Sequence, residues 1–218
     1  MPDLFDMPAL PSSGPRPLAD RLRPKSLAEV IGQETVLSAD GPLGAMLAAK
    51  SLNSLILWGP PGVGKTTIAR LLADETALNF VQISAIFTGV SDLRKVFEAA
   101  RHRRGNGQGT LLFVDEIHRF NKAQQDGFLP YMEDGTILLV GATTENPSFE
   151  LNAALMSRAQ VIVLNRLSLS DLERIAQRAE RELARALPLK GDAREALLEM
   201  ADGDGRLSSC QPRVAPTR

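Results

Sequence analysis

The sequence has a single cysteine, Cys210, and no apolar stretch that approaches the roughly 18 residues of a membrane-spanning helix. One cysteine cannot build an internal disulfide framework, which fits a reducing compartment. The N-terminus is acidic and rich in proline, unlike a secretory signal peptide. A net charge of −1 gives no overall sign of nucleic-acid binding, so any such contact would be a local patch. We therefore expect a cytoplasmic protein with no membrane partner.

The composition that is present is typical of a folded globular protein. Of the 218 residues, 44% are apolar and 23% are charged. This length allows one large domain with a small attachment. We expect a disordered tail over residues 1–17, an α/β domain over 18–166, a partial helical lid over 167–206 and an unstructured end over 207–218.

The segment Gly59–Thr67 follows the apolar run Leu55–Trp58 and satisfies the pattern G-x-x-x-x-G-K-[ST]. Phosphate oxygens need several converging donors, and glycines let backbone N–H groups turn inward without a Cβ in the way. A helix beginning near Lys65 adds unpaired N–H groups and the positive end of its dipole. Lys65 would reach the β- and γ-phosphates, and the Thr66 hydroxyl would bind Mg²⁺. The competing interpretation, a structural glycine-rich turn, is disfavoured by the flanking strand and helix.

The whole loop is therefore a candidate site for a nucleoside triphosphate. Its residues are Gly59, Pro60, Pro61, Gly62, Val63, Gly64, Lys65, Thr66 and Thr67.

An acidic pair, Asp115 and Glu116, comes 50 residues after Lys65 at the end of the apolar run Leu111–Val114. Ligands of open parallel sheets bind at the carboxyl ends of the strands, so Asp115 is expected to face the phosphate loop. A carboxylate there can hold the hydrated shell of Mg²⁺, which takes only one or two carboxylates. Glu116 is then placed to polarise the attacking water. The alternative is an acidic pair without a catalytic role.

Helical and strand-like segments alternate up to about Asn165, and only helical patterns follow. This order predicts an α/β fold, a parallel five-stranded sheet flanked by helices, followed by a partial helical lid. The expected strands are residues 55–58, 79–84, 111–114, 137–142 and 161–164. A helix is expected from Asn121 to just before Gly135.

Helix starts are predicted from residues that can cap the first turn. Capping boxes are expected at Ser26–Glu29, Asn121–Gln124 and Ser170–Glu173. Single caps are expected at Ser91 and Asn152.

Two further sites have weaker patterns. Thr143 and Thr144 end a strand that is expected beside the one ending in Asp115, where a hydroxyl can bond the γ-phosphate or the water; by itself, the pair indicates turn chemistry. Arg158 is either a surface arginine or a finger supplied to the γ-phosphate of a neighbouring subunit, a role that contributes several powers of ten in rate.

Together these features resemble the AAA+ ATPases, and among them the replication-associated recombination protein A group, whose eukaryotic relative is the Werner-helicase-interacting ATPase. The resemblance covers roughly residues 17–206. The stretches that carry it are Pro17–Pro24, Val30–Gln33, Leu57–Thr67, Phe113–Asp126, Gly141–Phe149 and Ser157-Arg158. Of these, His118–Asp126 and Glu145–Phe149 are particular to the group, and the rest is shared with clamp loaders and the Holliday-junction motor RuvB.

The resemblance implies residue roles that spacing does not provide. Val30 and Ile31 would line the adenine pocket of bound ATP. Thr143 (or Thr144) would be the first sensor and Arg158 a finger acting in trans. Arg206, in Gly203–Arg206, would reach the γ-phosphate from the helical lid as a second sensor.

It also implies partners and a place of action. These are a homo-oligomer, forked DNA or single-strand/double-strand junctions at stalled replication forks or recombination intermediates, and a nucleoid-associated location. Asp3-Leu4-Phe5 is similar to the Leu-Phe end of sliding-clamp binding peptides, and a single-strand-binding protein is another candidate partner. The incidental alternative is an apolar pair in a disordered tail.

After Arg206 the sequence departs from the group. Where an amphipathic helix is expected to continue the lid, Leu207–Pro212 has no helical pattern. We interpret this end as the result of a truncation or frameshift.

Three other functions are alternatives to an ATPase linked to DNA. A superfamily-two helicase, suggested by Asp115–His118, needs a second RecA-like domain, for which 218 residues leave no room. A transporter ATPase needs a Leu-Ser-Gly-Gly-Gln signature, which is absent. A nucleotide-binding interaction module with little turnover remains as the alternative.

Overall fold

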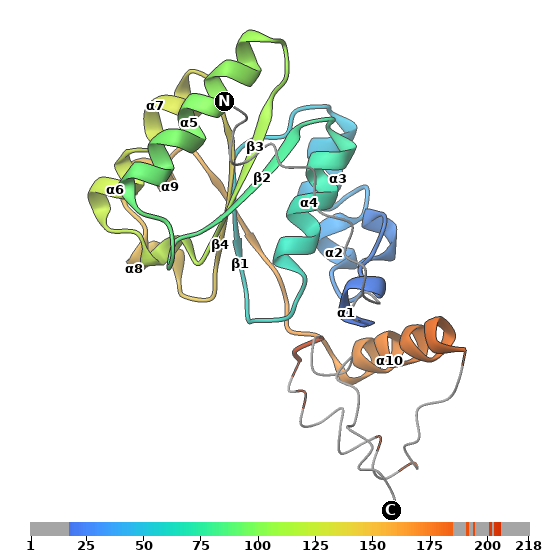
Figure 1. Cartoon of the computed structure of the whole chain (residues 1–218). Helices are drawn as coiled ribbons and strands as arrows, with labels where there is room; N and C mark the ends of the chain where they lie inside the picture. Colours follow the sequence, from blue (N-terminus) through green and yellow to red (C-terminus); the bar gives the residue numbers. More distant parts are fainter. Residues whose placement is uncertain (1–17, 185–190, 192–193, 195–200, 202, 206–218) are drawn as a thin grey trace, which may run out of the picture.

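The computed structural model describes residues 18–184, together with 191, 194, 201 and 203–205 (Figure 1). Several sequence predictions lie outside these residues: the disordered tail with Asp3-Leu4-Phe5, the second sensor Arg206 and the unstructured end after it.

Five parallel strands form one sheet in the order β2-β3-β4-β1-β5. Their bounds are β1 Leu55–Trp58, β2 Asn79–Ser84, β3 Thr110–Asp115, β4 Leu138–Thr143 and β5 Gln160–Val163. The predicted α/β fold is confirmed, and each strand lies within one residue of its predicted place. Because all five strands run the same way, their carboxyl ends lie along one edge of the sheet.

Both faces of the three central strands, β3, β4 and β1, are largely buried, and for this reason these strands read as continuous apolar runs rather than alternating ones. In β1, Leu55 and Leu57 pack into one hydrophobic cluster, whereas Ile56 packs into the other. Helix α4 covers the first face and α5 covers the second (Figure 1). The sheet is therefore a rigid central layer that holds the loops at its carboxyl edge.

The helices surround this sheet on both sides. Their bounds are α1 Leu18–Arg21, α2 Glu34–Leu37, α3 Pro42–Ala48, α4 Lys65–Glu75, α5 Val90–Gly105, α6 Lys122–Asp126, α7 Leu129–Glu133, α8 Pro147–Glu150, α9 Ala153–Met156 and α10 Leu169–Leu183, with short 3₁₀ turns η1 Leu27–Glu29 and η2 Ile117–Arg119. Helix α10 stands beyond the carboxyl edge and begins the expected lid (Figure 1). Within the described part of the chain, no helix has both the length and the apolarity needed to cross a membrane.

Two of the predicted helix caps are confirmed. The Asn121 side chain accepts a bond from the Gln124 backbone N–H at 2.9 Å, and the Gln124 side chain accepts one from Asn121 at 3.1 Å. The Asn152 side chain accepts a bond from the Leu155 backbone N–H at 2.8 Å. Each bond satisfies a backbone donor that the helix itself leaves unpaired.

The caps predicted at Ser91 and Ser170 are wrong. Helix α5 begins after Gly89, whose backbone N–H donates to the Asp92 carboxylate. Helix α10 is capped by Ser168, whose hydroxyl accepts a bond from the Asp171 backbone N–H at 3.2 Å. Two serines precede Asp171, and the sequence pattern does not decide between them.

The capping box at Ser26 is also wrong. Ser26 makes no side-chain cap bond, and the segment after it forms only the 3₁₀ turn η1. The Glu29 carboxylate instead accepts bonds from the Lys25 backbone N–H and from Arg178 of helix α10. A tertiary partner has replaced the local one.

The single helix predicted from Asn121 to Gly135 is likewise wrong. The segment forms two short helices, α6 and α7, that are separated at Gly127-Phe128. Phe128 is fully buried and packs edge-on against Phe97. Pro130 stands in the first turn of α7, where its missing N–H is tolerated, whereas it would interrupt a continuous helix.

Candidate functional site

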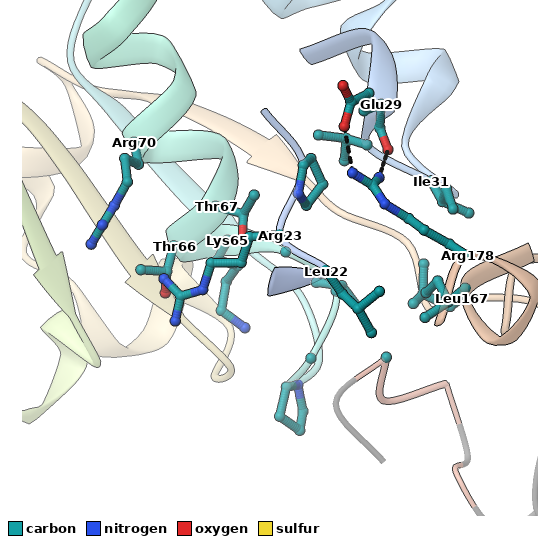
Figure 2. Close-up of a pocket in the computed structure, with 18 of the residues that line it drawn as sticks. Leu22, Arg23, Glu29, Ile31, Lys65, Thr66, Thr67, Arg70, Leu167 and Arg178 are labelled. Atoms are coloured by element: carbon teal, nitrogen blue, oxygen red, sulfur yellow. Dashed lines mark hydrogen bonds and ion pairs between the residues drawn. The ribbon is translucent and has the colours of Figure 1, made fainter. Parts of the chain in front are cut away.

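A cavity of about 500 Å³ lies at the carboxyl edge of the sheet, a size typical of sites for small ligands (Figure 2). Segments far apart in the sequence form its walls. They are the phosphate loop from Pro61 to Thr67, the end of β3, the turn after η1 and the start of the lid. The structure thus brings most of the predicted site residues to one place.

The phosphate loop has the conformation that its glycines allow. Gly62 and Gly64 have φ values of +75° and +99°, in the left-handed region that side chains disfavour. The Lys65 ammonium donates to the backbone carbonyls of Gly59 at 2.7 Å and Pro60 at 2.8 Å. Only 8% of Lys65 is exposed. A buried ammonium at the start of the 11-residue helix α4 suits a phosphate group.

The residues predicted to hold a magnesium ion line the same cavity. Thr66 comes from the first turn of α4, and Asp115 comes from the end of β3. One hydroxyl and one carboxylate form the kind of sparse oxygen set that Mg²⁺ takes when phosphates supply its other ligands. The residues present therefore fit the ion.

Glu116 also lines the cavity, and it has a left-handed backbone with φ of 53°. A non-glycine residue in this region costs of order 1–3 kcal/mol, and such strain concentrates at functional sites. Its carboxylate Oε2 lies 3.5 Å from the Thr144 hydroxyl, which donates to it. The same oxygen is 3.4 Å from His118 Nδ1.

The two candidate sensor threonines differ in environment. Thr143 is fully buried, and its hydroxyl accepts a bond from the Glu145 backbone N–H at 3.0 Å and contacts His118 Nδ1 at 3.0 Å. Thr144 directs its hydroxyl to Glu116. Neither threonine lines the cavity directly. The sequence pattern predicts no role for His118, which belongs to the group-specific stretch His118–Asp126.

The opposite end of the cavity is apolar and is where the base of a nucleotide would lie. Val30 and Ile31 are in its wall, and their role at the adenine stays a prediction. Leu22, Leu167 and Ile175 line the same cavity, and Figure 2 labels the first two. These last three were missed, because only their position in the fold distinguishes them from ordinary core residues.

The described part of the motif that ends in Arg206 packs on the phosphate loop. A Cβ built on Gly62 would lie 1.8 Å from the Asp204 carboxylate and 2.8 Å from its Cα. Gly205 lines the cavity. The chain therefore reaches the phosphate end of the cavity one residue before Arg206, whose role stays a prediction.

Gly62→Ala is expected to weaken ATP binding by roughly tenfold or more, because the methyl group would displace the lid as well as strain the loop. Gly107→Ala is the matched control. Gly107 has a similar φ of +78°, but nothing lies within 4 Å of its Cβ position. Titration of a fluorescent ATP analogue checks both variants. Equal affinities for Gly62→Ala and the unmodified protein would show that the lid does not rest on Gly62 in solution.

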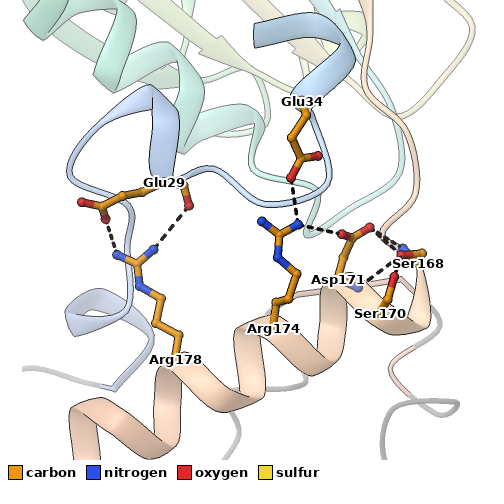
Figure 3. Close-up of polar contacts among 7 residues, drawn as sticks. All are labelled: Glu29, Glu34, Ser168, Ser170, Asp171, Arg174 and Arg178. Atoms are coloured by element: carbon orange, nitrogen blue, oxygen red, sulfur yellow. Dashed lines mark hydrogen bonds and ion pairs between the residues drawn. The ribbon is translucent and has the colours of Figure 1, made fainter. Parts of the chain in front are cut away.

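Ion pairs join the lid helix to the N-terminal segment beside the cavity (Figure 3). The Arg178 guanidinium donates to the Glu29 carboxylate and, at 3.4 Å, to the Glu29 carbonyl. Arg174 donates to Glu34 at 2.8 Å. The Lys25 backbone N–H and then Arg178 hold the pKa of Glu29 below its ordinary 4.5. Arg174 likewise lowers the pKa of Glu34. Both ion pairs hold helix α10 against the N-terminal segment, beside the base end of the cavity.

Glu29→Gln is expected to lower ATP affinity about two- to fivefold at low salt, and less at high salt, since exposed ion pairs are weak and screened. Because the pKa of Glu29 is lowered, its contribution is present above pH 4.5 and is lost as the pH falls through the lowered value. Glu182→Gln is the control, since Glu182 is on the same helix as Arg178 and the substitution removes its 3.0 Å ion pair with Arg21 of α1. Calorimetric titration at two salt concentrations measures the difference. An equal loss in both variants would contradict a specific clasp at the base end.

Arg158 lies away from the cavity. It follows α9 and precedes β5, so it is at the amino edge of the sheet, and its Nε donates to Glu133 at 2.7 Å. The four residues of β5 alone span about 13 Å toward the carboxyl edge. Arg158 therefore cannot serve the cavity of its own chain.

The sequence of this chain is similar to those of a protein family and of several curated proteins. Residues 55–167 match the family described as "ATPase family associated with various cellular activities (AAA)". The replication-associated recombination protein A of Escherichia coli is 49% identical over 196 residues, covering 88% of this chain and 44% of that protein. The ATPase WRNIP1 of Dictyostelium discoideum is 44% identical and likewise covers 88% of this chain, but 22% of its own length. The chain thus spans less than half the length of these relatives.

A solved structure is similar as well. The Thermotoga maritima RuvB Holliday junction branch migration motor superposes with a TM-score of 0.68 at 32% identity, covering 86% of this chain and 63% of that one. The fold with its parallel sheet is thus an arrangement that another chain shares.

Proposed function

We propose, from the premise that this chain belongs to the AAA family of ATPases, that it binds ATP and hydrolyses it to ADP and phosphate in work on DNA. One observation carries the proposal. The buried ammonium of Lys65, the carboxylates of Asp115 and Glu116 and the apolar residues Val30 and Ile31 all meet at a single cavity.

The chemistry follows from these positions. Lys65 and the backbone N–H groups of the phosphate loop bind the β- and γ-phosphates and orient the triphosphate. A magnesium ion held by Thr66 and Asp115 would supply positive charge to the same phosphate oxygens. Glu116 polarises the attacking water and accepts its proton. The Thr144 hydroxyl, which lies against Glu116, orients that carboxylate.

Two arginines outside the described cavity wall complete the proposed site. Arg206 reaches the γ-phosphate from the lid, one residue beyond the Gly205 that lines the cavity. Arg158 is supplied by a neighbouring copy in a homo-oligomer, because its place at the amino edge excludes its own cavity.

DNA is the proposed partner because the names of the relatives refer to replication, recombination and Holliday junctions. They are called replication-associated recombination protein and Holliday junction branch migration motor. We propose forked DNA or single-strand/double-strand junctions as the substrate, at stalled forks or recombination intermediates, in a cytoplasmic protein associated with the nucleoid. A sliding clamp or a single-strand-binding protein is proposed as a further partner, with Asp3-Leu4-Phe5 as the clamp contact.

Phosphate release at steady state, with and without forked DNA, tests the proposal. Turnover is expected in the unmodified chain, with stimulation by forked DNA, and Lys65→Ala is expected to abolish it because the triphosphate loses its buried cation. If the chain binds ATP but its turnover equals that of Lys65→Ala, the enzyme is excluded and the chain is a nucleotide-binding module. Turnover that ignores DNA would exclude the DNA-linked part alone.

A further inference from the structure

Three polar side chains form a contact chain beside the cavity, on loops that follow neighbouring strands. Glu116 and His118 follow β3, and Thr143 ends β4. The side chain of His118 is only 6% exposed, that of Glu116 is 27% exposed, and Thr143 is fully buried. Glu116 Oε2 lies 3.4 Å from His118 Nδ1, which lies 3.0 Å from the Thr143 hydroxyl. A histidine so enclosed has little freedom to reorient.

The hydrogens available to this chain decide which nitrogen of His118 carries one. The Thr143 hydroxyl accepts a bond from the Glu145 N–H at 3.0 Å and can donate its single hydrogen to the Glu145 carbonyl at 3.2 Å. In that arrangement His118 Nδ1 is the donor in its contact with Thr143. The opposite tautomer, with Thr143 donating to Nδ1, would place the lone pairs of Nδ1 and of the Glu116 carboxylate against each other. The contact with Glu116 therefore favours a hydrogen on Nδ1.

Backbone hydrogen bonds fix both ends of this chain of side-chain contacts. The turn η2 returns on itself through a bond from the Arg119 N–H to the Glu116 carbonyl at 2.8 Å, and Ile117 within it is fully buried. At the other end, the Gly59 N–H of the phosphate loop donates to the Thr143 carbonyl at 3.2 Å. Thr143 is thus tied to the loop that holds the phosphates, and His118 spans the distance from it to Glu116.

We propose that His118 is a positioning residue for hydrolysis. The single hydrogen of its Nδ1, shared between the Thr143 hydroxyl at 3.0 Å and the Glu116 carboxylate at 3.4 Å, restrains that carboxylate in the orientation that polarises the attacking water; this rests on the hydrolysis proposed above. The left-handed backbone of Glu116 makes such a restraint necessary, because a strained residue keeps one orientation only when its surroundings enforce it. A displacement of about 1 Å at a catalytic group costs roughly a hundredfold in rate.

His118→Leu removes the donor while filling a similar volume, and His118→Asn keeps an amide N–H near the position of Nδ1. His118→Leu is expected to lower kcat by at least about tenfold, with the KM for ATP little changed because His118 is not among the residues that line the cavity. His118→Asn is expected to recover most of that loss. In a Glu116→Gln background, His118→Leu should cause no further loss, since there is no longer a carboxylate to position.

Nuclear magnetic resonance of the imidazole nitrogens gives a second measurement that needs no turnover. The chain has two histidines, His102 and His118, so a His102→Gln variant assigns the signals. A hydrogen on Nδ1 of His118 is expected in the nucleotide-free protein. In Thr143→Val this hydrogen is expected to be held less firmly on Nδ1, because the hydroxyl that accepts it is lost.

The outcomes separate this inference from the proposed function. An unchanged kcat in His118→Leu, an equal loss in the Glu116→Gln background, or an unprotonated Nδ1 would each overturn the positioning role while hydrolysis stands. If the unmodified chain turns over no faster than Glu116→Gln, the proposed hydrolysis fails and the positioning role fails with it. A hydrogen on Nδ1 in such a chain would then report only a structural contact.

Discussion

Glu116→Gln is expected to lower ATP turnover by at least about a hundredfold while leaving ATP affinity within about twofold. Glutamine has nearly the shape of glutamate but cannot accept a proton from water. The phosphate loop is expected to make the binding contacts, and the substitution leaves its own bonds in place, because Lys65 donates to the carbonyls of Gly59 and Pro60. Affinity and rate should therefore separate in this variant.

A single-turnover experiment with radiolabelled ATP measures the two quantities in the same sample. Glu145→Gln is the matched control, since it removes an exposed carboxylate from the loop that follows β4. Its rate should equal that of the unmodified chain. Unchanged hydrolysis in Glu116→Gln would remove the catalytic base from the proposal, and lost ATP binding would show that Glu116 acts through the structure of the cavity.

Arg158→Ala is expected to reduce turnover by about a thousandfold or more in an assembled protein, the range found for arginine fingers, with ATP affinity unchanged. The structure supports a role in trans, because Arg158 lies at the amino edge of the sheet and the cavity lies at the carboxyl edge. In this chain the guanidinium pairs with Glu133, a pairing that assembly would have to replace.

Mixing variants tests this directly. Arg158→Ala and Glu116→Gln are each inactive alone, but a mixed assembly contains sites with Glu116 from one copy and Arg158 from the next. Activity should reappear on mixing, and it should rise more steeply than linearly with protein concentration. Arg94→Ala, an exposed arginine of α5, is the control for loss of charge. An Arg158→Ala chain with full activity at every concentration would exclude the finger.

The sequence alone predicted the features that depend on neighbouring residues. The glycines of the phosphate loop, Gly62 and Gly64, take the positive φ values that such a loop requires. The central strands β1, β3 and β4 were recognised because a strand buried on both faces is a short apolar run. Local capping at Asn121 and Asn152 was also predicted, since each bond spans only three residues.

The errors had two different causes. Glu29 has the spacing of a capping box with Ser26, but it bonds to Arg178, 149 residues later in the chain, and no local pattern reports that partner. The helix predicted after Asn121 divides before Pro130, which stands in the first turn of α7 and has no N–H to continue a helix. That second error was a local signal left unused.

The sequence by itself therefore determined that a phosphate loop exists, that an acidic pair ends a buried strand, and that both belong to an α/β fold. Only the tertiary structure decided what surrounds them. The order β3-β4-β1 puts Thr143 between Glu116 and the phosphate loop, and it is this order that brings His118 into the chain of contacts. The docking of α10 likewise sets Arg178 against Glu29. Short-range conformation follows from adjacent residues, whereas these contacts depend on how whole strands and helices pack, which no single stretch of sequence encodes.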